Sequence, residues 1–200
     1  MHCISLEPKH LGFIKSLGYV PVGLGEKNFT SEWMRDNTGI NISQKNKYYG
    51  EYTYHYWIWK NYLDKIGKDW IGFCQYRKFW SLKKVDDKNL SIEKLSSVVL
   101  KNIPEEFNKY DVILGEPFQF EQKNIKFIKR NFKLILSNPM VLFDKQKINV
   151  NFQFDLMHGQ NNLKKAIDLL DRENKKDFND FVNNKTEFNP HNMFICKSKK

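Results

Sequence analysis

Cysteine is scarce in this sequence, and its spacing limits the kinds of site that the chain can build. The 200 residues contain 3 cysteines, Cys3, Cys74 and Cys196, which lie far apart and form no Cys-x-x-Cys pair. Such spacing argues against a disulfide-stapled fold and against a cysteine-based zinc site. We therefore expect a protein of the reducing cytoplasm.

Long hydrophobic runs are also missing. No stretch approaches the roughly 20 apolar residues that cross a bilayer, and the opening MHCISLEPKH lacks the basic region and apolar core of a secretory signal. Hydrophobic residues make up 40% of the chain and aromatic residues 15%, which suffices for a proper core. We expect one domain over residues 1–200.

Arginine is rare although the chain is basic. The formal net charge is +10, but the arginines are only Arg35, Arg77, Arg130 and Arg172. Base readout in nucleic acids favours the guanidinium fork over lysine, so this composition argues against nucleic-acid binding. Scattered lysines indicate a solvated surface, or contact with an anionic membrane or a phosphate-rich substrate.

Several catalytic signatures are absent. The sequence has no Gly-x-Ser-x-Gly elbow, no P-loop, no His-Glu-x-x-His and no Gly-x-Gly-x-x-Gly. It also lacks the Asp-x-Asp motif with which nucleotide-sugar enzymes usually hold a divalent ion. The pair Asp86-Asp87 has no intervening residue and stands in a charged loop. We predict no metal ligands.

The residues that are present concentrate their chemistry between Asp36 and Trp80. A polar turn comes first, in which Asn41 or Ser43 can cap the next helix. Aromatic and apolar residues then recur every three or four positions, which predicts one helix face packed in the core; they are Tyr48, Tyr52, Tyr56, Trp59 and Leu63. Tyr49, Trp57 and Ile58 widen this face, so we expect the helix to be largely buried. Glu51 lies on this helix and would need a partner if it were buried.

A short buried strand is predicted at Asp69–Cys74, followed by four polar residues from Gln75 to Lys78. Open α/β folds bind ligands beyond the carboxyl ends of their parallel strands, so this is a candidate ligand position. Residues 21–25 are interpreted as a turn, because two glycines without a strand-to-helix context do not make a phosphate loop.

Further strands are predicted at Tyr110–Leu114 and Met193–Ile195, and helices over residues 91–103 and 161–170. Together these elements predict an α/β fold. Residues 1–20 are weakly patterned, so we expect the opening strand of such a fold to be missing, and elements after the last strand to be missing as well.

Four segments resemble a bacterial family of unknown function whose members occur among capsular and exopolysaccharide biosynthesis proteins and are regarded as glycosyltransferase-like. The first three are residues 38–46, 49–53 and 56–61, and residues 72–80 are similar to the Gly-x-x-His-Tyr-Arg-Arg-Tyr-Phe segment of that family. The later segments 110–114 and 192–195 also resemble the family, so the resemblance covers residues 20–196. Gln75 replaces the family histidine and Lys78 its second arginine, so proton transfer by that histidine is lost here.

The resemblance implies a GT-A-like, Rossmann-related domain with a mixed central sheet. It also implies a hexosyltransferase-type enzyme that moves a sugar from a nucleotide-sugar to a surface polysaccharide or a lipid-linked glycan. Fixed cations can stabilise a leaving diphosphate as Mg²⁺ does elsewhere. The candidates for holding the diphosphate or an acceptor phosphate are Tyr76, Arg77 and Lys78. A divalent ion, Mn²⁺ or Mg²⁺, is compatible with this chemistry, although its usual motif is absent.

Other roles are open at this level. Asn41, Ser43 and Asn46 could bind the hydroxyls of the donor sugar, or they could merely cap a helix. The candidates for the base that activates the acceptor are Glu51, Asp111 and His158. A non-catalytic carbohydrate- or nucleotide-binding module, or a truncated remnant, is the alternative to an enzyme. A lysine-rich surface is compatible with peripheral docking at the anionic inner face of the cell membrane.

Overall fold

The computed structural model describes residues 1–66, 70–85, 91–119, 132–137, 139–142 and 148–198. They form two compact units, which are described separately. The first comprises Met1–Gly115 with His191–Lys200, and the second comprises Glu116–Pro190. The expectation of one domain over residues 1–200 stays a prediction.

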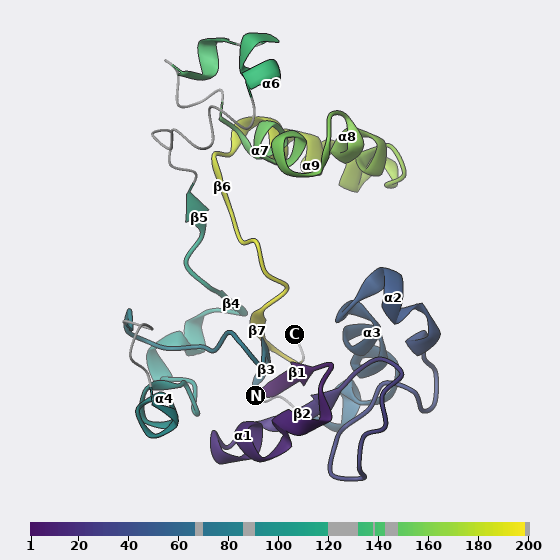
Figure 1. Cartoon of the computed structure of the whole chain (residues 1–200), viewed down its shortest axis with the longest axis vertical. Helices are drawn as coiled ribbons and strands as arrows, with labels where there is room; N and C mark the ends of the chain where they lie inside the picture. The colour runs from purple at the N-terminus through teal and green to yellow at the C-terminus, as the bar shows by residue number, and fades with distance from the viewer. Residues whose placement is uncertain (67–69, 86–90, 120–131, 138, 143–147, 199–200) are drawn as a thin grey trace. The chain divides into compact units, whose positions relative to one another are not determined.

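The first unit is built on a five-stranded mixed sheet in the order β2-β1-β3-β7-β4 (Figure 1). β1 (His2–Ser5) pairs in parallel with β2 (Val20–Gly23) and β3 (Trp70–Gln75). β7 (Phe194–Lys197) is antiparallel to both β3 and β4 (Val112–Leu114). The predicted α/β class with a mixed sheet is confirmed, and the three predicted strands correspond to β3, β4 and β7.

The prediction that the opening strand is missing is wrong. β1 begins at the second residue, lies inside the sheet, and all four of its residues are buried. Its sequence, His-Cys-Ile-Ser, hides this position because both ends are polar. Both ends find partners in the structure, since His2 Nδ1 lies 2.6 Å from Tyr54 Oη and Ser5 Oγ lies 2.8 Å from His10 Nδ1.

Alternating side chains of the strands point into two cores. Cys3 and Cys74 face a core with Ile14 and Leu17 from the region of α1 (Leu11–Ser16). The same core receives Val99, which follows α4 (Ile92–Val98); the α4 N-terminus is capped because Ser91 Oγ accepts a hydrogen bond from Lys94 N. Ile4 and Phe73 face the other core, which the inner side of α3 completes.

The predicted aromatic helix is two helices, and its buried face was assigned only partly correctly. A 3₁₀ turn η2 (Ser43–Lys45) leads into α2 (Asn46–Tyr49), and α3 (Tyr52–Asn61) follows Gly50. Gly50 has φ 53° and ψ −134°, a conformation open mainly to glycine. The buried residues of α3 are Thr53, Tyr54, Trp57 and Ile58.

Of the residues predicted to be core, Trp57, Ile58 and Leu63 do pack in it, but several others are exposed. Tyr48 is 80% exposed, Tyr52 52% and Trp59 59%. Both sides of α3 carry aromatic residues, so a period of three to four cannot decide which side faces the sheet. Packing decides it, because Tyr54 and Trp57 contact Ile4 and Phe73 on the strands.

The second unit has a small core of Val150, Leu163, Ile167 and Val182 between three helices. These are α7 (Val150–His158), α8 (Asn162–Ile167) and α9 (Arg172–Asn184). Two strands, β5 (Phe118–Gln119) and β6 (Glu187–Phe188), pair antiparallel. The helix predicted over 161–170 corresponds to α8, while α9 was not predicted.

The remaining short elements complete the two units; they are η1 (Pro8–His10), η3 (Leu63–Lys65), η5 (Glu105–Lys109), α6 (Phe132–Ser137) and η6 (Pro139–Leu142). No helix in the described ranges is both long and apolar enough to span a membrane.

Candidate functional site

The parallel strands β2, β1 and β3 all end at one edge of the sheet. From β1 the chain goes first to β2 on one side and then returns to β3 on the other. This reversal is a topological switch point, beside which open α/β sheets bind their ligands. The segments that follow the three strands therefore define the candidate site.

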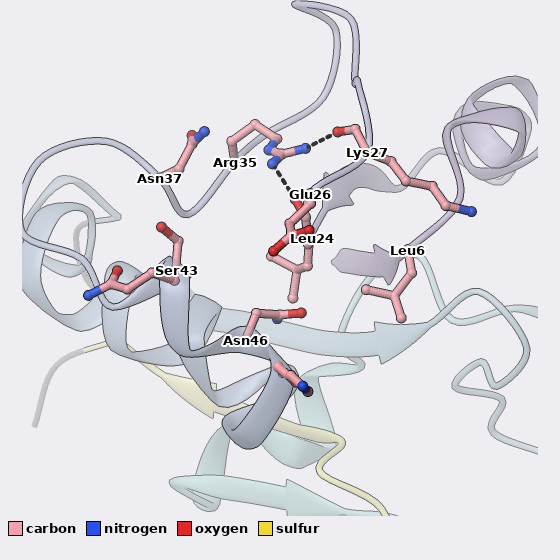
Figure 2. A pocket seen from close by; sticks show the side chains of 11 residues that line it. Leu6, Leu24, Glu26, Lys27, Arg35, Asn37, Ser43 and Asn46 are labelled. Carbon is pink, nitrogen blue, oxygen red and sulfur yellow. Dashed lines mark hydrogen bonds between the residues drawn. The ribbon is translucent and has the colours of Figure 1, made fainter.

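A pocket of about 910 Å³ lies at this edge. Its lining comes from Leu6 after β1, from Leu24–Lys27 after β2, and from η2 and α2. Figure 2 shows Arg35 and Asn37 on one side of the pocket and Ser43 and Asn46 on the other. Its volume falls within the usual range for small-molecule sites.

Arg35 holds the loop after β2 in place. Its Nη2 donates to Gly25 O at 2.8 Å and its Nη1 donates to Lys27 O at 3.3 Å (Figure 2). Its guanidinium also lies 4.5 Å above the Phe29 ring. The turn predicted over residues 21–25 is only partly correct, because residues 21–23 belong to β2. The chain turns at Gly25, which has φ 81° and lines the pocket.

Two of the three residues predicted to bind donor hydroxyls line this pocket, namely Ser43 and Asn46. Asn41 supports Ser43 instead, because Asn41 Oδ1 accepts from Ser43 N at 3.2 Å and from Ser43 Oγ at 2.8 Å. Asn46 Nδ2 donates to Gly50 O at 2.9 Å and to Thr53 Oγ1 at 3.2 Å. Asn46 thereby joins the pocket to the start of α3.

The polar cluster after β3 forms a tight turn. Lys78 N donates to Gln75 O at 2.9 Å, which leaves Tyr76 and Arg77 at the tip. The Arg77 guanidinium lies 5.1 Å from the centre of the Tyr76 ring, and Arg77 and Lys78 are both exposed. Lys78 Nζ lies 2.5 Å from His191 Nε2. The turn thus presents two cations at the same edge as the pocket.

Glu51 stands beside this turn. Its Oε1 accepts from Gln75 Nε2 at 2.7 Å and from Asn192 Nδ2 at 3.4 Å. Tyr52 Oη donates to Asn192 Oδ1 at 2.7 Å. Gln75, which stands where the family pattern has histidine, therefore orients a carboxylate at the strand end.

One residue of this edge was missed in the sequence, His10. Its ring stacks on Tyr76 with centres 4.2 Å apart, and Ser5 Oγ holds its Nδ1. Burial, followed by the nearby Lys9 charge, lowers the pKa of His10 below its ordinary value. No motif pointed to His10, because it follows a strand that the sequence did not reveal.

Of the other two predicted base candidates, Asp111 lies away from this turn and His158 belongs to the second unit. β4 is parallel to β3, because both are antiparallel to β7, and Asp111 precedes β4. Asp111 therefore lies at the opposite edge of the sheet, 3.8 Å from Lys197 Nζ. His158 ends α7 in the second unit, where its ring lies 4.4 Å from that of Phe154.

The side chains that line the pocket are more basic than acidic. In the part of the chain that the structure describes, no three His, Cys, Asp or Glu side chains gather as ligands. The pocket lining carries Lys27, Arg35 and Lys47 against the single carboxylate of Glu26. This set of side chains favours an anion over a cation.

Comparison with known proteins gives one family and one structure. A family model described as "Domain of unknown function (DUF4422)" matches residues 6–200. No curated protein matches the chain. A solved structure, titled as the apo structure of the bifunctional glycosyltransferase WbbM, is similar with 19% identity and a TM-score of 0.38. The match covers 82% of this chain and 28% of that one, so the chain spans less than a third of its length. A likeness at this level says nothing of activity.

Proposed function

From the premise that this chain belongs to the DUF4422 family, we propose that its first unit binds a nucleotide-sugar and transfers the sugar to a surface-polysaccharide acceptor. The observation that carries the proposal is the pairing of a basic, amide-lined pocket with a two-cation turn at one edge of a parallel strand group. The resemblance of residues 38–61 and 72–80 to polysaccharide-biosynthesis proteins supports the same substrate class.

The pocket suits the nucleoside end of such a donor. Its floor is apolar at Leu6 and Leu24, where a base or ribose can pack. Its polar groups, the Ser43 hydroxyl and the Asn46 amide, can exchange hydrogen bonds with sugar hydroxyls. Lys47 adds a positive charge at the rim.

The diphosphate is assigned to Arg77 and Lys78, with Tyr76 beneath the guanidinium. When the bond from the sugar to the diphosphate breaks, negative charge develops on the leaving oxygen. Fixed cations stabilise that charge without reorganising during the reaction. Arg77 also offers a planar fork that matches two phosphate oxygens.

Glu51 is the favoured base for an inverting reaction. Gln75 and Asn192 hold one of its oxygens, which leaves the second oxygen to face an acceptor hydroxyl. The acceptor oxygen would then bond to the sugar carbon while Glu51 takes its proton and the nucleoside diphosphate leaves with the bonding electron pair. Asp111, at the far edge, is the weaker candidate.

A panel of nucleotide-sugars, scored for binding and for turnover with Mn²⁺ or with a chelator, tests this proposal. Turnover that is unaffected by the chelator supports catalysis by the cations of the turn. Binding without turnover supports the alternative, a non-catalytic nucleotide- or carbohydrate-binding module. A chain that neither binds nor turns over any member contradicts both functions.

A further inference from the structure

The outer side of α2 and α3 is an exposed aromatic surface, called here the outer aromatic face. Its members are Tyr48, Tyr49, Tyr52, Tyr56 and Trp59. Four of them are at least half exposed, with Tyr48 at 80%, Trp59 at 59%, Tyr52 at 52% and Tyr49 at 50%. Ile40, 60% exposed, adjoins the face, because its backbone exchanges hydrogen bonds with the Asn61 side chain at the end of α3.

Helical geometry gathers the α3 residues on one side. Tyr52, Tyr56 and Trp59 are spaced by four and three positions, which puts them above one another, opposite the buried Tyr54 and Trp57. A helix with aromatic residues on both sides is normally covered on both sides. Contiguous exposed apolar surfaces usually mark a binding partner.

Lysines surround this face. Lys60 Nζ lies 3.4 Å from the centre of the Trp59 ring and 5.8 Å from that of Tyr56, while Lys47 Nζ lies 5.9 Å from that of Tyr48. Lys45 and Lys65, which are close to this face in sequence, are also exposed. Two carboxylates are close in sequence: Glu51 is turned toward Gln75, and Asp64 is exposed next to Lys65 in the chain. The surface is therefore aromatic and positively charged.

The ring geometry separates two kinds of partner. A sugar stacks on a flat, free aromatic face, but Lys60 already covers a face of Trp59. The Tyr56 ring meets Trp59 edge-on, at 5.9 Å and 87°. Amphipathic Tyr and Trp rings with neighbouring lysines are instead the composition of surfaces that sit at the headgroup level of a bilayer.

We propose that the outer aromatic face docks the protein on an anionic phospholipid bilayer. The exposed rings enter the headgroup region, and Lys45, Lys60 and Lys65 lie against lipid phosphates. Tyr52 belongs to this face and also bonds Asn192, which contacts Glu51. The docked bilayer would thus lie next to the strand-end turn. A lipid-linked acceptor follows from this contact only if the proposed transferase function holds; the docking itself does not depend on it.

Vesicle cosedimentation of the full chain tests the docking surface. We expect binding to vesicles of phosphatidylcholine with phosphatidylglycerol, weak binding to phosphatidylcholine alone, and a marked loss at high salt. The double substitution Tyr48→Ser with Trp59→Ser should weaken binding at least tenfold. Lys60→Glu with Lys65→Glu should weaken it too and remove most of the salt dependence.

Controls keep the outcomes distinct. Leu169→Ser with Lys164→Glu changes equally exposed residues of the second unit and should leave vesicle binding unchanged. Circular dichroism and nucleotide-sugar binding should be unchanged in all variants. If the native chain binds vesicles but no nucleotide-sugar, that result counts against the proposed function alone. The docking proposal is overturned if the native chain ignores anionic vesicles or if the face variants bind them normally. It is also overturned if these substitutions abolish self-association or soluble-glycan binding instead.

Discussion

Arg77 stands at the tip of the turn after β3, with the Tyr76 ring beneath its guanidinium. Its side chain is exposed, so Arg77→Ala should leave the fold intact. Because a single preorganised charge on a developing anion is worth about 10²–10³ in rate, we expect transfer to fall by about that factor. Initial rates with the preferred donor measure this change. Arg172→Ala, an exposed arginine of α9, is the matched control, and near-normal turnover by Arg77→Ala would remove the residue from the mechanism.

Glu51 and Asp111 are both carboxylates, but they lie at opposite edges of the sheet. Glu51→Gln keeps the shape and removes the base, so the rate constant should fall by about 10²–10⁴ while donor affinity stays unchanged. Asp111→Asn should leave both unchanged. Single-turnover rates and calorimetric donor binding separate the two effects. A large loss with Asp111→Asn and none with Glu51→Gln would reverse the assignment.

The buried His2 and the half-buried His55 should make stability depend on pH. Burial lowers the pKa of His2 to about 4 and that of His55 to about 4. Between the ordinary value of about 6.5 and pH 4 the unfolded chain binds more protons than the folded one, so stability is present above pH 6.5 and falls with pH below it. Each histidine contributes on the order of 3 kcal/mol to this loss. Denaturant titrations from pH 7.5 to 4 measure it.

His55 offers a direct check of that interpretation. It lies between Phe73 and Phe194, and its Nε2 is buried without a hydrogen-bond partner. His55→Phe removes the unpaired atom and should stabilise the protein by about 1 kcal/mol at pH 7. It should also reduce the acid-induced loss by roughly half. An unchanged pH dependence in this variant would mean that His55 is not the titrating group.

At the scale of elements, Gly50 separates α2 from α3. A Cβ at this position meets nothing within 4 Å, so any loss of stability in Gly50→Ala comes from backbone strain alone. We expect a loss of about 1–3 kcal/mol in unfolding free energy. Donor affinity should fall as well, because Asn46 bonds the Gly50 carbonyl. Gly12→Ala, also in open space but without positive φ, is the control. Equal stability of the two variants would contradict this account.

The sequence predicted some elements and concealed others for identifiable reasons. β3 could be predicted because the run Trp70–Cys74 is apolar and polar residues follow it directly. β1 was hidden because its two ends, His2 and Ser5, are polar. Their partners include Tyr54, far along the chain, and His10, in an unpredicted turn. The break at Gly50 was hidden because the spacing of aromatic residues continues across it.

At the scale of the whole molecule, the pocket follows from strand order. Leu6, residues 24–27 and residues 43–47 are separate in sequence and meet because β2, β1 and β3 are parallel neighbours. Sequence patterns found Ser43, Asn46 and the turn after β3, because polar residues collect there. They could not find Leu6 or Arg35, whose importance depends on the sheet order.

The measurement that tests the central claim most directly is hydrogen exchange of the full chain with and without a saturating nucleotide-sugar. A donor held at the strand-end edge should slow amide exchange in residues 24–27, 43–47 and 75–78 of the first unit. The amides of Asp111 and His158 should exchange as before. Protection confined to the second unit, or no protection with any nucleotide-sugar, would contradict the account.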